Sequence, residues 1–429
     1  MSKDCRHITV FEHERLRFDR GDECLSDNLY KALDRFHGAG TPYFKLIHHG
    51  VQFTEYVGVL QVGNSLIEVL PKADRHVHTE SEEKRWRDIL IDMMRAVGGF
   101  DIHATSNAHL RIRPNTILDL YFELFIRETE YLLHTGLAKQ YRKTEGNRTA
   151  LKGSLQFAKH IQQNLTHQER FYVRHSTYDV EHRLHMILYK TIRLLRRINT
   201  NADLHSRIGS LLLNFPEMPD IPVSESLFQK LVFNRKTQRY QKAVGIARMI
   251  LLNYHPDVQH GRNDVLALMF DMNLLWEQFL YVTLRKLPLE GVSVREQVPK
   301  NFWKPDTGRF ARLQPDILVE WEGGNAILDT KWKNLNGKNP SPEDLRQMYV
   351  YHEYFGATKA AGTTKAALVY PGEEDSEKTG AYISPADVEQ PGKSCSVILL
   401  NVPKKSAGNK PDVRKWQEGI RGKICKWLG

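Results

Sequence analysis

The residues with the clearest capacity for chemistry lie between positions 314 and 333. The sequence there runs Gln-Pro-Asp-Ile-Leu-Val-Glu-Trp, then Glu-Gly-Gly-Asn, then Ala-Ile-Leu-Asp-Thr-Lys-Trp-Lys. Two apolar runs flank a Gly-Gly pair, a pattern that predicts a β-hairpin. Asp316 opens the first expected strand and Asp329 closes the second, so antiparallel pairing would bring both carboxylates to one end of the hairpin. Lys331 follows Asp329 by two residues and should leave the same face of the strand.

Two carboxylates and one ammonium at one place could hydrolyse a phosphodiester. Mg²⁺ prefers oxygen ligands and usually keeps several waters. An ion held by Asp316 and Asp329 would polarise a phosphoryl oxygen and lower the pKa of an attacking water, while Lys331 would stabilise the developing negative charge. The residues alone leave a second interpretation open, a surface salt bridge of Asp329 with Lys331 or Lys333, because acidic-x-Lys triplets are common by chance.

Three more polar residues extend this candidate site. Glu277 lies in the otherwise apolar sequence Met-Asn-Leu-Leu-Trp-Glu-Gln-Phe-Leu, where a carboxylate must be paired, exposed or a metal ligand, since burying it alone is costly. Gln347 and Tyr351 are four residues apart on an expected helix and therefore share one face. They could hydrogen-bond a phosphate or orient Lys331; taken by themselves they would be ordinary helix residues.

The surrounding pattern predicts a mixed α+β or α/β chain with several domains. Two strands joined at Gly63-Asn64 predict a hairpin over 57–70, and helical spacing predicts helices over 80–97 and 115–135, the second entered by Pro114. The pattern over 136–263 predicts mainly helices, and the proline-rich segment 215–223 predicts a linker. From 264 onward we expect a long apolar helix over 265–284, several short strands, a helix over 342–355 and a basic C-terminal helix.

These patterns divide the chain into three expected sections. Residues 1–135 would form a β-hairpin and helical domain, residues 136–263 a mainly helical region, and residues 264–429 a core with a central mixed sheet flanked by helices. The C-terminal helix could contact phosphates with its basic side chains or pack its apolar face on this core.

Composition narrows the class of protein only broadly. The 429 residues include 61 Lys and Arg against 51 Asp and Glu, a net charge of +10, which weakly favours polyanionic partners. No run of about 20 apolar residues predicts a membrane span, and no apolar segment near the start predicts a secretory signal. The four widely spaced cysteines, without CxxC pairs, favour a reducing cytoplasm over a disulfide scaffold.

The pattern of site residues resembles the PD-(D/E)xK nuclease superfamily in its RecB-like branch. The residues that carry the resemblance are Asp316, Asp329-x-Lys331, the upstream helical Glu277 and Gln347-xxx-Tyr351. A closer resemblance is to the McrC family, the nuclease subunits of McrBC modification-dependent restriction systems. The sequence Leu-Lys-Gly-Ser-Leu-Gln-Phe at 151–157 is similar to that family's Lys-Gly-Arg-Ile block, with Ser154 in place of the usual Arg, and the 57–72 hairpin is similar to that of longer McrC relatives.

The resemblance implies a role for each of these residues. Asp316, Asp329 and Glu277 would hold Mg²⁺, with Mn²⁺ as a possible substitute, and Lys331 would be the catalytic lysine. It implies a PD-(D/E)xK nuclease core at 264–429 and a cytoplasmic DNA endonuclease subunit that acts on DNA carrying 5-methylcytosine. It also implies a partner, a McrB-like AAA+ GTPase ring that docks on section 1–135 and is stimulated there. The sequence contains no GxxxxGK[ST] motif, so GTP would be used by the partner and not by this chain.

Two other functions remain open at this point. The chain could be a non-catalytic adaptor that regulates an AAA+ ring and keeps the nuclease fold only as a scaffold. It could also be a stand-alone repair nuclease of the same superfamily. Alanine variants of Asp329 and Lys331 distinguish the first alternative, and cleavage by the isolated chain distinguishes the second.

Overall fold

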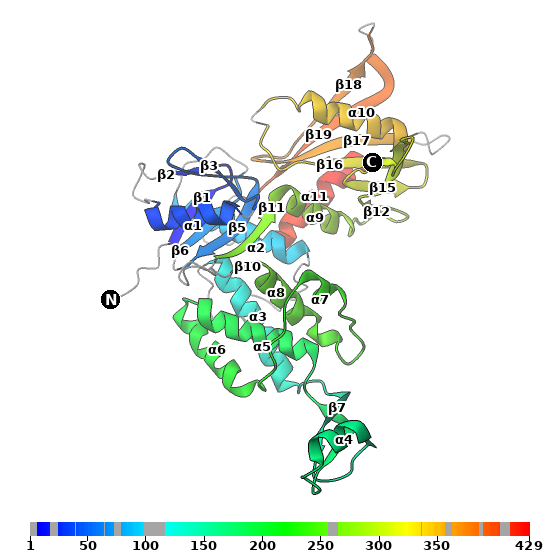
Figure 1. Cartoon of the computed structure of the whole chain (residues 1–429). Helices are drawn as coiled ribbons and strands as arrows, with labels where there is room; N and C mark the ends of the chain where they lie inside the picture. Colours follow the sequence, from blue (N-terminus) through cyan, green and yellow to red (C-terminus); the bar gives the residue numbers. More distant parts are fainter. Residues whose placement is uncertain are drawn as a thin grey trace. The chain divides into compact units, whose positions relative to one another are not determined.

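The computed structural model describes residues 7–17, 25–38, 40–63, 65–72, 79–97, 116–255, 265–335, 337–356, 363–385, 389–403 and 412–429. Within these residues it has a mixed α+β architecture with several sheets and eleven α-helices (Figure 1). The chain forms two compact units: unit 1 joins Met1–Ala104 to Met269–Gly429, and unit 2 is Thr105–Leu268. This grouping places the start of the chain with its end; the three functional sections expected from the sequence stay a prediction.

A six-stranded mixed sheet forms the C-terminal part of unit 1. Its order is β12 (Ser293–Glu296), β15 (Ile317–Trp321), β16 (Gly324–Thr330), β17 (Thr363–Gly372), β19 (Glu389–Asn401) and β18 (Ser376–Ile383). β15 and β16 are antiparallel, and β16, β17 and β19 are parallel to one another. The expected β15–β16 hairpin is therefore present, and the left-handed φ of +86° at Gly323 explains the glycine in its turn.

Burial and helix packing fix this sheet in place. Every residue of β16 is buried, as expected for a strand with a neighbour on each side and covered faces. Helix α10 (Pro342–Gly356) packs through Met348, Tyr351 and Phe355 onto buried residues of β15, β16 and β17. Its start matches the expected position, since Ser341 Oγ accepts a hydrogen bond from the backbone N–H of Asp344 at 3.2 Å.

The N-terminal part of unit 1 is built on β1 (His7–Phe11), β6 (Ser65–Leu70) and β5 (Tyr56–Val62). β5 and β6 form the antiparallel hairpin expected over 57–70, and β1 runs parallel to β6. Asn64, expected in the turn, lies outside the described residues. A second small sheet has the order β2 (Arg15–Arg17), β4 (Gly50–Phe53) and β3 (Phe44–Ile47), near α1 (Asp27–Gly38). Helix α2 (Glu80–Val97) follows, as its apolar spacing predicts.

Trp332 directly follows the Asp329-x-Lys331 motif in the sequence, and its contacts connect several parts of unit 1. The Trp332 ring lies 6.3 Å from that of Trp86 and 5.3 Å from that of Trp276. Its Nε1–H donates to the buried carboxylate of Glu12 at 2.7 Å, and its backbone N–H donates to Asn273 Oδ1 at 3.1 Å. These contacts fix the end of β16 from both the start of the chain and helix α9 (Met272–Leu284).

The C-terminal helix α11 (Val413–Leu428) packs its apolar face inward. Its residues Trp416, Ile420, Ile424 and Trp427 are buried, and the Trp416 ring lies 4.6 Å from that of Phe279 on α9. The basic side chains of α11 lie around this face, so packing on the core accounts for its apolar stripe.

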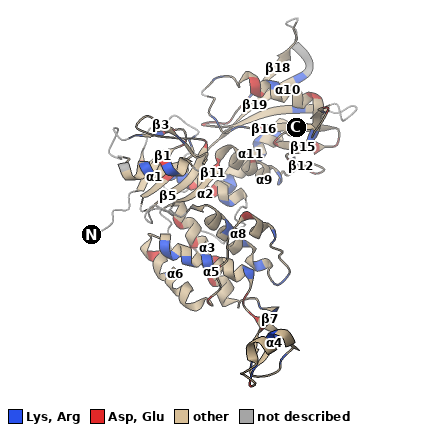
Figure 2. Ribbon diagram, viewed as in Figure 1, with Lys and Arg blue, Asp and Glu red and all other residues tan. Residues whose placement is uncertain are grey.

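Unit 2 contains a helical group and a small β-rich arm. The helices are α3 (Ile117–His134), α5 (Arg183–Ile198), α6 (Ala202–Asn214), α7 (Glu225–Gln229) and α8 (Gln241–Leu252), and Figure 2 marks the basic residues along α5. Helix α3 covers the expected helix; Pro114 and Asn115 lie outside the described residues. β10 (Tyr254–His255) belongs to this unit and pairs antiparallel with β11 (Val265–Asp271), a strand that continues past Leu268, where the unit ends.

The arm adds strands that the expectation of a mainly helical section over 136–263 did not include, although helices still predominate there. β7 (Gln140–Arg148) pairs with β9 (Phe171–Asp179), which also pairs with β8 (Ser154–Leu155), and α4 (Phe157–Asn164) lies between β8 and β9. The signal was present but subtle. β7 alternates between partly buried and exposed residues with the period of two that marks a strand, although nearly all of its side chains are polar.

Two further expectations were wrong. The apolar run 265–284 is not one helix: β11 ends at Asp271, whose carboxylate accepts from the backbone N–H groups of Asn273 and Leu274 and begins α9. An N-cap inside an apolar run separates a strand from a helix, which hydrophobicity alone does not reveal. The proline-rich segment 215–223 connects α6 to α7 inside unit 2 and separates no units.

Among the described residues, no helix has the length and apolar character needed to cross a membrane. Cys395 and Cys425 are free thiols, while Cys5 and Cys24 lie outside the described residues.

Candidate active site

The β15–β16 hairpin brings Asp316 and Asp329 to one end. Ile317 pairs with Leu328, so the register continues directly to these two aspartates on neighbouring strands. The Asp316 carboxylate is held by Thr330, whose backbone N–H and Oγ1 both donate to Oδ2, at 2.7 and 2.9 Å. The two acids therefore lie side by side, Asp329 buried within β16 and Asp316 half-buried directly before β15.

Lys331 completes the group. Its Nζ lies 2.8 Å from Asp329 Oδ2, and the two side chains are 27% and 1% exposed. A surface salt bridge does not describe this pair, because its acidic member is buried. Lys333 pairs instead with Asp344 at 2.6 Å, near the start of α10. The strand end and the helix that borders the site are thus tied together.

The acids of this site are crowded. Burial, and next the Asp316 charge, raise the pKa of Asp329 to about 6. Burial also raises the pKa of Asp316 despite its hydrogen bonds from Thr330. Burial, followed by the Asp316 charge, raises the pKa of Glu277 to about 7. Burial is the largest cause of all three raised pKa values, and the charge of neighbouring carboxylates adds to it at Asp329 and Glu277.

Lys331 is the cation that partly offsets this charge. Burial lowers its pKa, but the adjacent Asp329 carboxylate outweighs that effect and the pKa of Lys331 is raised. The ammonium is therefore protonated at neutral pH and is present as a charge, not as a base.

Gln347 and Tyr351 form hydrogen bonds to the segments that carry the two aspartates. Gln347 Nε2 donates to Asp329 Oδ1 at 3.3 Å and to the Tyr351 hydroxyl at 2.9 Å. The Tyr351 hydroxyl in turn donates to the backbone carbonyl of Gln314 at 3.0 Å. This chain of hydrogen bonds fixes one carboxylate and the segment that leads into the other.

Gln297 is a site residue that the sequence did not reveal. Its Nε2 donates to Glu277 Oε1 at 2.9 Å, its Oε1 accepts from Gln314 Nε2 at 3.1 Å, and its backbone N–H donates to the carbonyl of Asp316 at 2.9 Å. Its φ is +46°, a left-handed conformation that is uncommon for a residue other than glycine. Strain of this kind persists where the surroundings require it. No short motif marks such a residue.

The donor set suits a hard divalent cation held by few protein ligands. Asp329 offers buried and Asp316 half-buried carboxylate oxygens, and Asp329 Oδ2 has the ion pair with Lys331 but no hydrogen bond in the described structure. Among the described residues, no three His, Cys, Asp or Glu side chains form a ready metal-binding group. Mg²⁺ commonly uses one or two carboxylates plus water and substrate oxygens, so the two aspartates fit it. The metal-ligand role of Glu277 stays a prediction.

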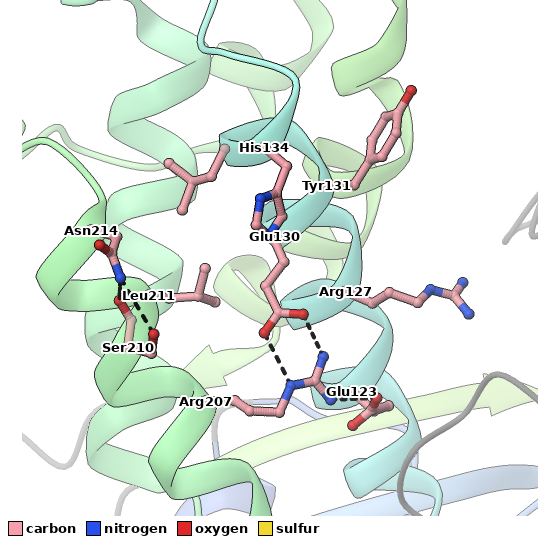
Figure 3. A pocket seen from close by; sticks show the side chains of 10 residues that line it. Glu123, Arg127, Glu130, Tyr131, His134, Arg207, Ser210, Leu211 and Asn214 are labelled. Carbon is pink, nitrogen blue, oxygen red and sulfur yellow. Dashed lines mark hydrogen bonds and ion pairs between the residues drawn. The ribbon is translucent and has the colours of Figure 1, made fainter.

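A second charged cluster lies in unit 2, in a cavity of about 670 Å³ between α3 and α6 (Figure 3). Arg207 from α6 donates to both oxygens of Glu130, at 3.0 and 2.6 Å, and to Glu123 Oε1 at 2.5 Å. Burial by itself would lower the pKa of this guanidinium. Its hydrogen bonds to the two glutamates outweigh that effect, so the pKa is raised above its usual value. Here one arginine bonds both acids, whereas in the described structure Lys331 forms its ion pair with Asp329 and not with Asp316.

The fold and this site define a class, a mixed α+β protein with a carboxylate–lysine cluster at the end of a buried sheet. The model of the family described as "McrBC 5-methylcytosine restriction system component" matches residues 51–371. That span is about three quarters of the chain, and the chain belongs to this family.

Two solved structures are similar to this fold. A refined half-complex from the tetradecameric assembly of Thermococcus gammatolerans McrB AAA+ hexamers with bound McrC is 17% identical, with a TM-score of 0.67, over 98% of this chain and 100% of that one. The cryo-EM structure of the Thermococcus gammatolerans McrBC complex is 18% identical, with a TM-score of 0.50, over 68% and 89%. No match was found among curated proteins.

Proposed function

We propose that this chain is the DNA endonuclease subunit of a 5-methylcytosine-dependent restriction complex, with a PD-(D/E)xK core in unit 1. Asp316, Asp329 and Lys331 carry the chemistry, and Gln347 and Tyr351 position the acids. The single observation that carries the proposal is the convergence of a buried aspartate, a half-buried aspartate and one protonated lysine at the end of a buried sheet. Membership of the McrBC family supports the same proposal, a role in a restriction complex.

The residues of the chain have distinct tasks in phosphodiester hydrolysis. Asp316 and Asp329 would hold Mg²⁺, which when bound supplies charge that polarises a phosphoryl oxygen and makes a water molecule more acidic. Lys331 stabilises the negative charge that develops on the phosphate, since it is protonated and lies beside the acids. Gln347 keeps Asp329 Oδ1 in place through its amide, and Thr330 does the same for Asp316 Oδ2. Glu277, with a pKa near 7, assists in positioning metal or water.

The partner in this proposal is a McrB-like AAA+ GTPase ring that this chain binds and stimulates. The fold similarity to McrC bound to McrB AAA+ hexamers supports it. Unit 2 adds a physical reason. Phe157, Ile161 and Leu165 follow one another at intervals of four on and just beyond α4 and are 70%, 62% and 74% exposed. An apolar stripe of this kind is typical of a surface that another protein covers. The docking role of residues 1–135 stays a prediction.

The test is cleavage of methylated DNA by the purified chain with its partner, GTP and Mg²⁺. We expect cleavage that Asp329→Ala and Lys331→Ala abolish, while Lys378→Ala, which removes an exposed lysine of the same unit, cleaves like the parent. GTP hydrolysis by the partner should remain stimulated in all three variants, because the catalytic residues have no part in it.

The alternatives predict different results. If both alanine variants restrict DNA as well as the parent, the chain is an adaptor with a retained nuclease fold. If the chain alone cleaves as fast as the complex, it is a stand-alone nuclease.

A further inference from the structure

A small hairpin projects from the candidate active site. β13 (Lys300–Trp303) and β14 (Ala311–Leu313) pair with each other and with no other strand among the described residues. The hairpin begins three residues after Gln297 and ends just before Gln314, and these two glutamines are hydrogen-bonded to each other at 3.1 Å. The base of the hairpin is thus built from the residues that hold Glu277 and the Asp316 segment.

The hairpin is fixed to the neighbouring helix on one side. Lys300 Nζ donates to the carbonyl of Tyr354 on α10 at 3.1 Å and lies 4.2 Å from the centre of the Phe355 ring. The Phe302 ring meets that of Tyr354 edge to face at 5.1 Å. These contacts give the hairpin a defined position beside the acids.

The outer part of the hairpin combines exposed aromatic and basic side chains. Phe302, Trp303 and Phe310 are 46%, 61% and 46% exposed, which is unusual for large aromatic residues so close together. Over 298–313 there are four basic residues and one acidic residue, a net charge of +3. Within the described structure, the exposed side chains of Lys304, Arg309 and Arg312 form no ion pair.

We propose that the β13–β14 hairpin is a DNA-contacting element that holds the substrate strand at Asp316, Asp329 and Lys331. The proposal rests on the proposed function, since it names the surface through which the same site receives DNA. Lys304, Arg309 and Arg312 contact phosphates, whose charge they complement, and Trp303 and Phe310 stack on bases or sugars. Basic groups interleaved with exposed aromatic rings are the combination by which proteins hold nucleic-acid strands.

The test compares three variants of the full-length chain. The first removes the hairpin charges (Lys304→Ala, Arg309→Ala, Arg312→Ala), and the second removes the rings (Trp303→Ala, Phe310→Ala). The third is a matched control that removes three exposed charges from α11 (Arg414→Ala, Lys415→Ala, Lys426→Ala). Binding to a labelled duplex, and to a single strand of the same sequence, is measured by fluorescence anisotropy with EDTA over a range of salt. Cleavage is then measured with the partner, GTP and Mg²⁺.

We expect the charge variant to bind at least about 10-fold more weakly and to lower the slope of log Kd against log salt by about 3, roughly 0.9 for each lost phosphate contact. The ring variant should weaken binding by about 10-fold with an unchanged slope. Both should cleave more slowly, unfold at the parent's temperature and sediment like the parent, while the α11 control binds and cleaves like the parent.

Three results would overturn the inference. The hairpin variants could bind and cleave like the parent, the α11 control could lose as much affinity as the charge variant, or the hairpin variants could change self-association in place of DNA binding. A parent complex that cleaves no DNA would instead contradict the proposed function, so the two failures are distinguishable.

Discussion

The two charge clusters of this chain differ in how their acids are paired with a cation. In unit 2, Glu123 and Glu130 share Arg207, whose guanidinium bonds both carboxylates directly. In unit 1, Asp316 and Asp329 face each other with Lys331 as the cation within ion-pair distance, and the pKa of Asp329 rises to about 6. Among the described residues, each cluster thus has one cation for two acids, but Arg207 bonds both of its acids, while Lys331 pairs with Asp329 alone. An acid without an ion pair in the described structure, such as Asp316, can take a cation from outside.

The largest expected effect distinguishes a catalytic role of Asp329 from a structural one. Asp329→Asn should reduce cleavage by at least about 10³-fold, the scale for losing an essential catalytic group. The free energy of unfolding without metal should not fall, since the change removes a buried carboxylate that is crowded by Asp316. Cleavage rates and urea denaturation measure the two quantities. A variant that unfolds easily and still cleaves would show that the aspartate is structural.

Arg207→Met tests the other cluster. Glu123 is 3% exposed and would be left without its cation, so we expect a loss of about 3 kcal/mol in the free energy of unfolding. Cleavage per folded molecule should stay unchanged. The double variant Arg207→Met/Glu123→Gln is the control and should recover part of the loss, because the uncompensated charge is gone. A loss below about 0.5 kcal/mol would make the cluster unimportant for stability.

Glu12 represents a third solution, a buried carboxyl kept neutral. Burial raises its pKa from 4.5 to about 8, even though Lys72 N–H and Trp332 Nε1–H donate to it. The folded state therefore holds the proton more tightly than the unfolded state. Its contribution to stability is fully present below pH 4.5 and is lost as the pH rises towards 8.

Glu12→Gln should remove that pH dependence. We expect the variant to unfold like the parent at pH 4.5 and to be more stable by about 4 kcal/mol at pH 8, because it mimics the protonated form. Thermal denaturation between pH 4.5 and 8.5 measures this. Equal pH profiles for parent and variant would mean that Glu12 ionises as freely as in the unfolded chain.

The smallest expected effect concerns Gln297, the residue of the candidate active site with a left-handed φ. Gln297→Gly relieves a φ of +46° and should stabilise the chain by about 1 kcal/mol, while the loss of its bridge between Glu277 and Gln314 slows cleavage by about 10-fold. Gln297→Asn is the matched control, since it tolerates the same backbone conformation with a side chain too short for the bridge. Full cleavage by either variant would exclude a positioning role.

The sequence predicted the central geometry because one hairpin determines it. The Gly-Gly turn sets the register, and the register sets Asp316 beside Asp329, so local rules are sufficient. The apolar spacing of α2, α10 and α11 was equally legible. Two strands were harder to predict: β7 was missed because its side chains are nearly all polar, and β11 because it continues directly into an apolar helix.

Other parts of the site depend on contacts between distant residues. Gln297 meets Glu277 and Gln314 only after three separate segments have folded, and Glu12 reaches Trp332 across 320 positions. No spacing rule connects such residues. The exposure of Trp303 and Phe310 was likewise invisible, since aromatic residues in a sequence are expected to be core residues until the structure shows them on the surface.

The most direct measurement is the anomalous diffraction signal of crystals of the full chain soaked in Mn²⁺. The account predicts an anomalous peak between the carboxylates of Asp316 and Asp329, which Asp329→Asn removes, and no peak at Glu123 and Glu130. A chain that binds Mn²⁺ at the glutamates of unit 2, or shows no peak beside the two aspartates, would contradict it.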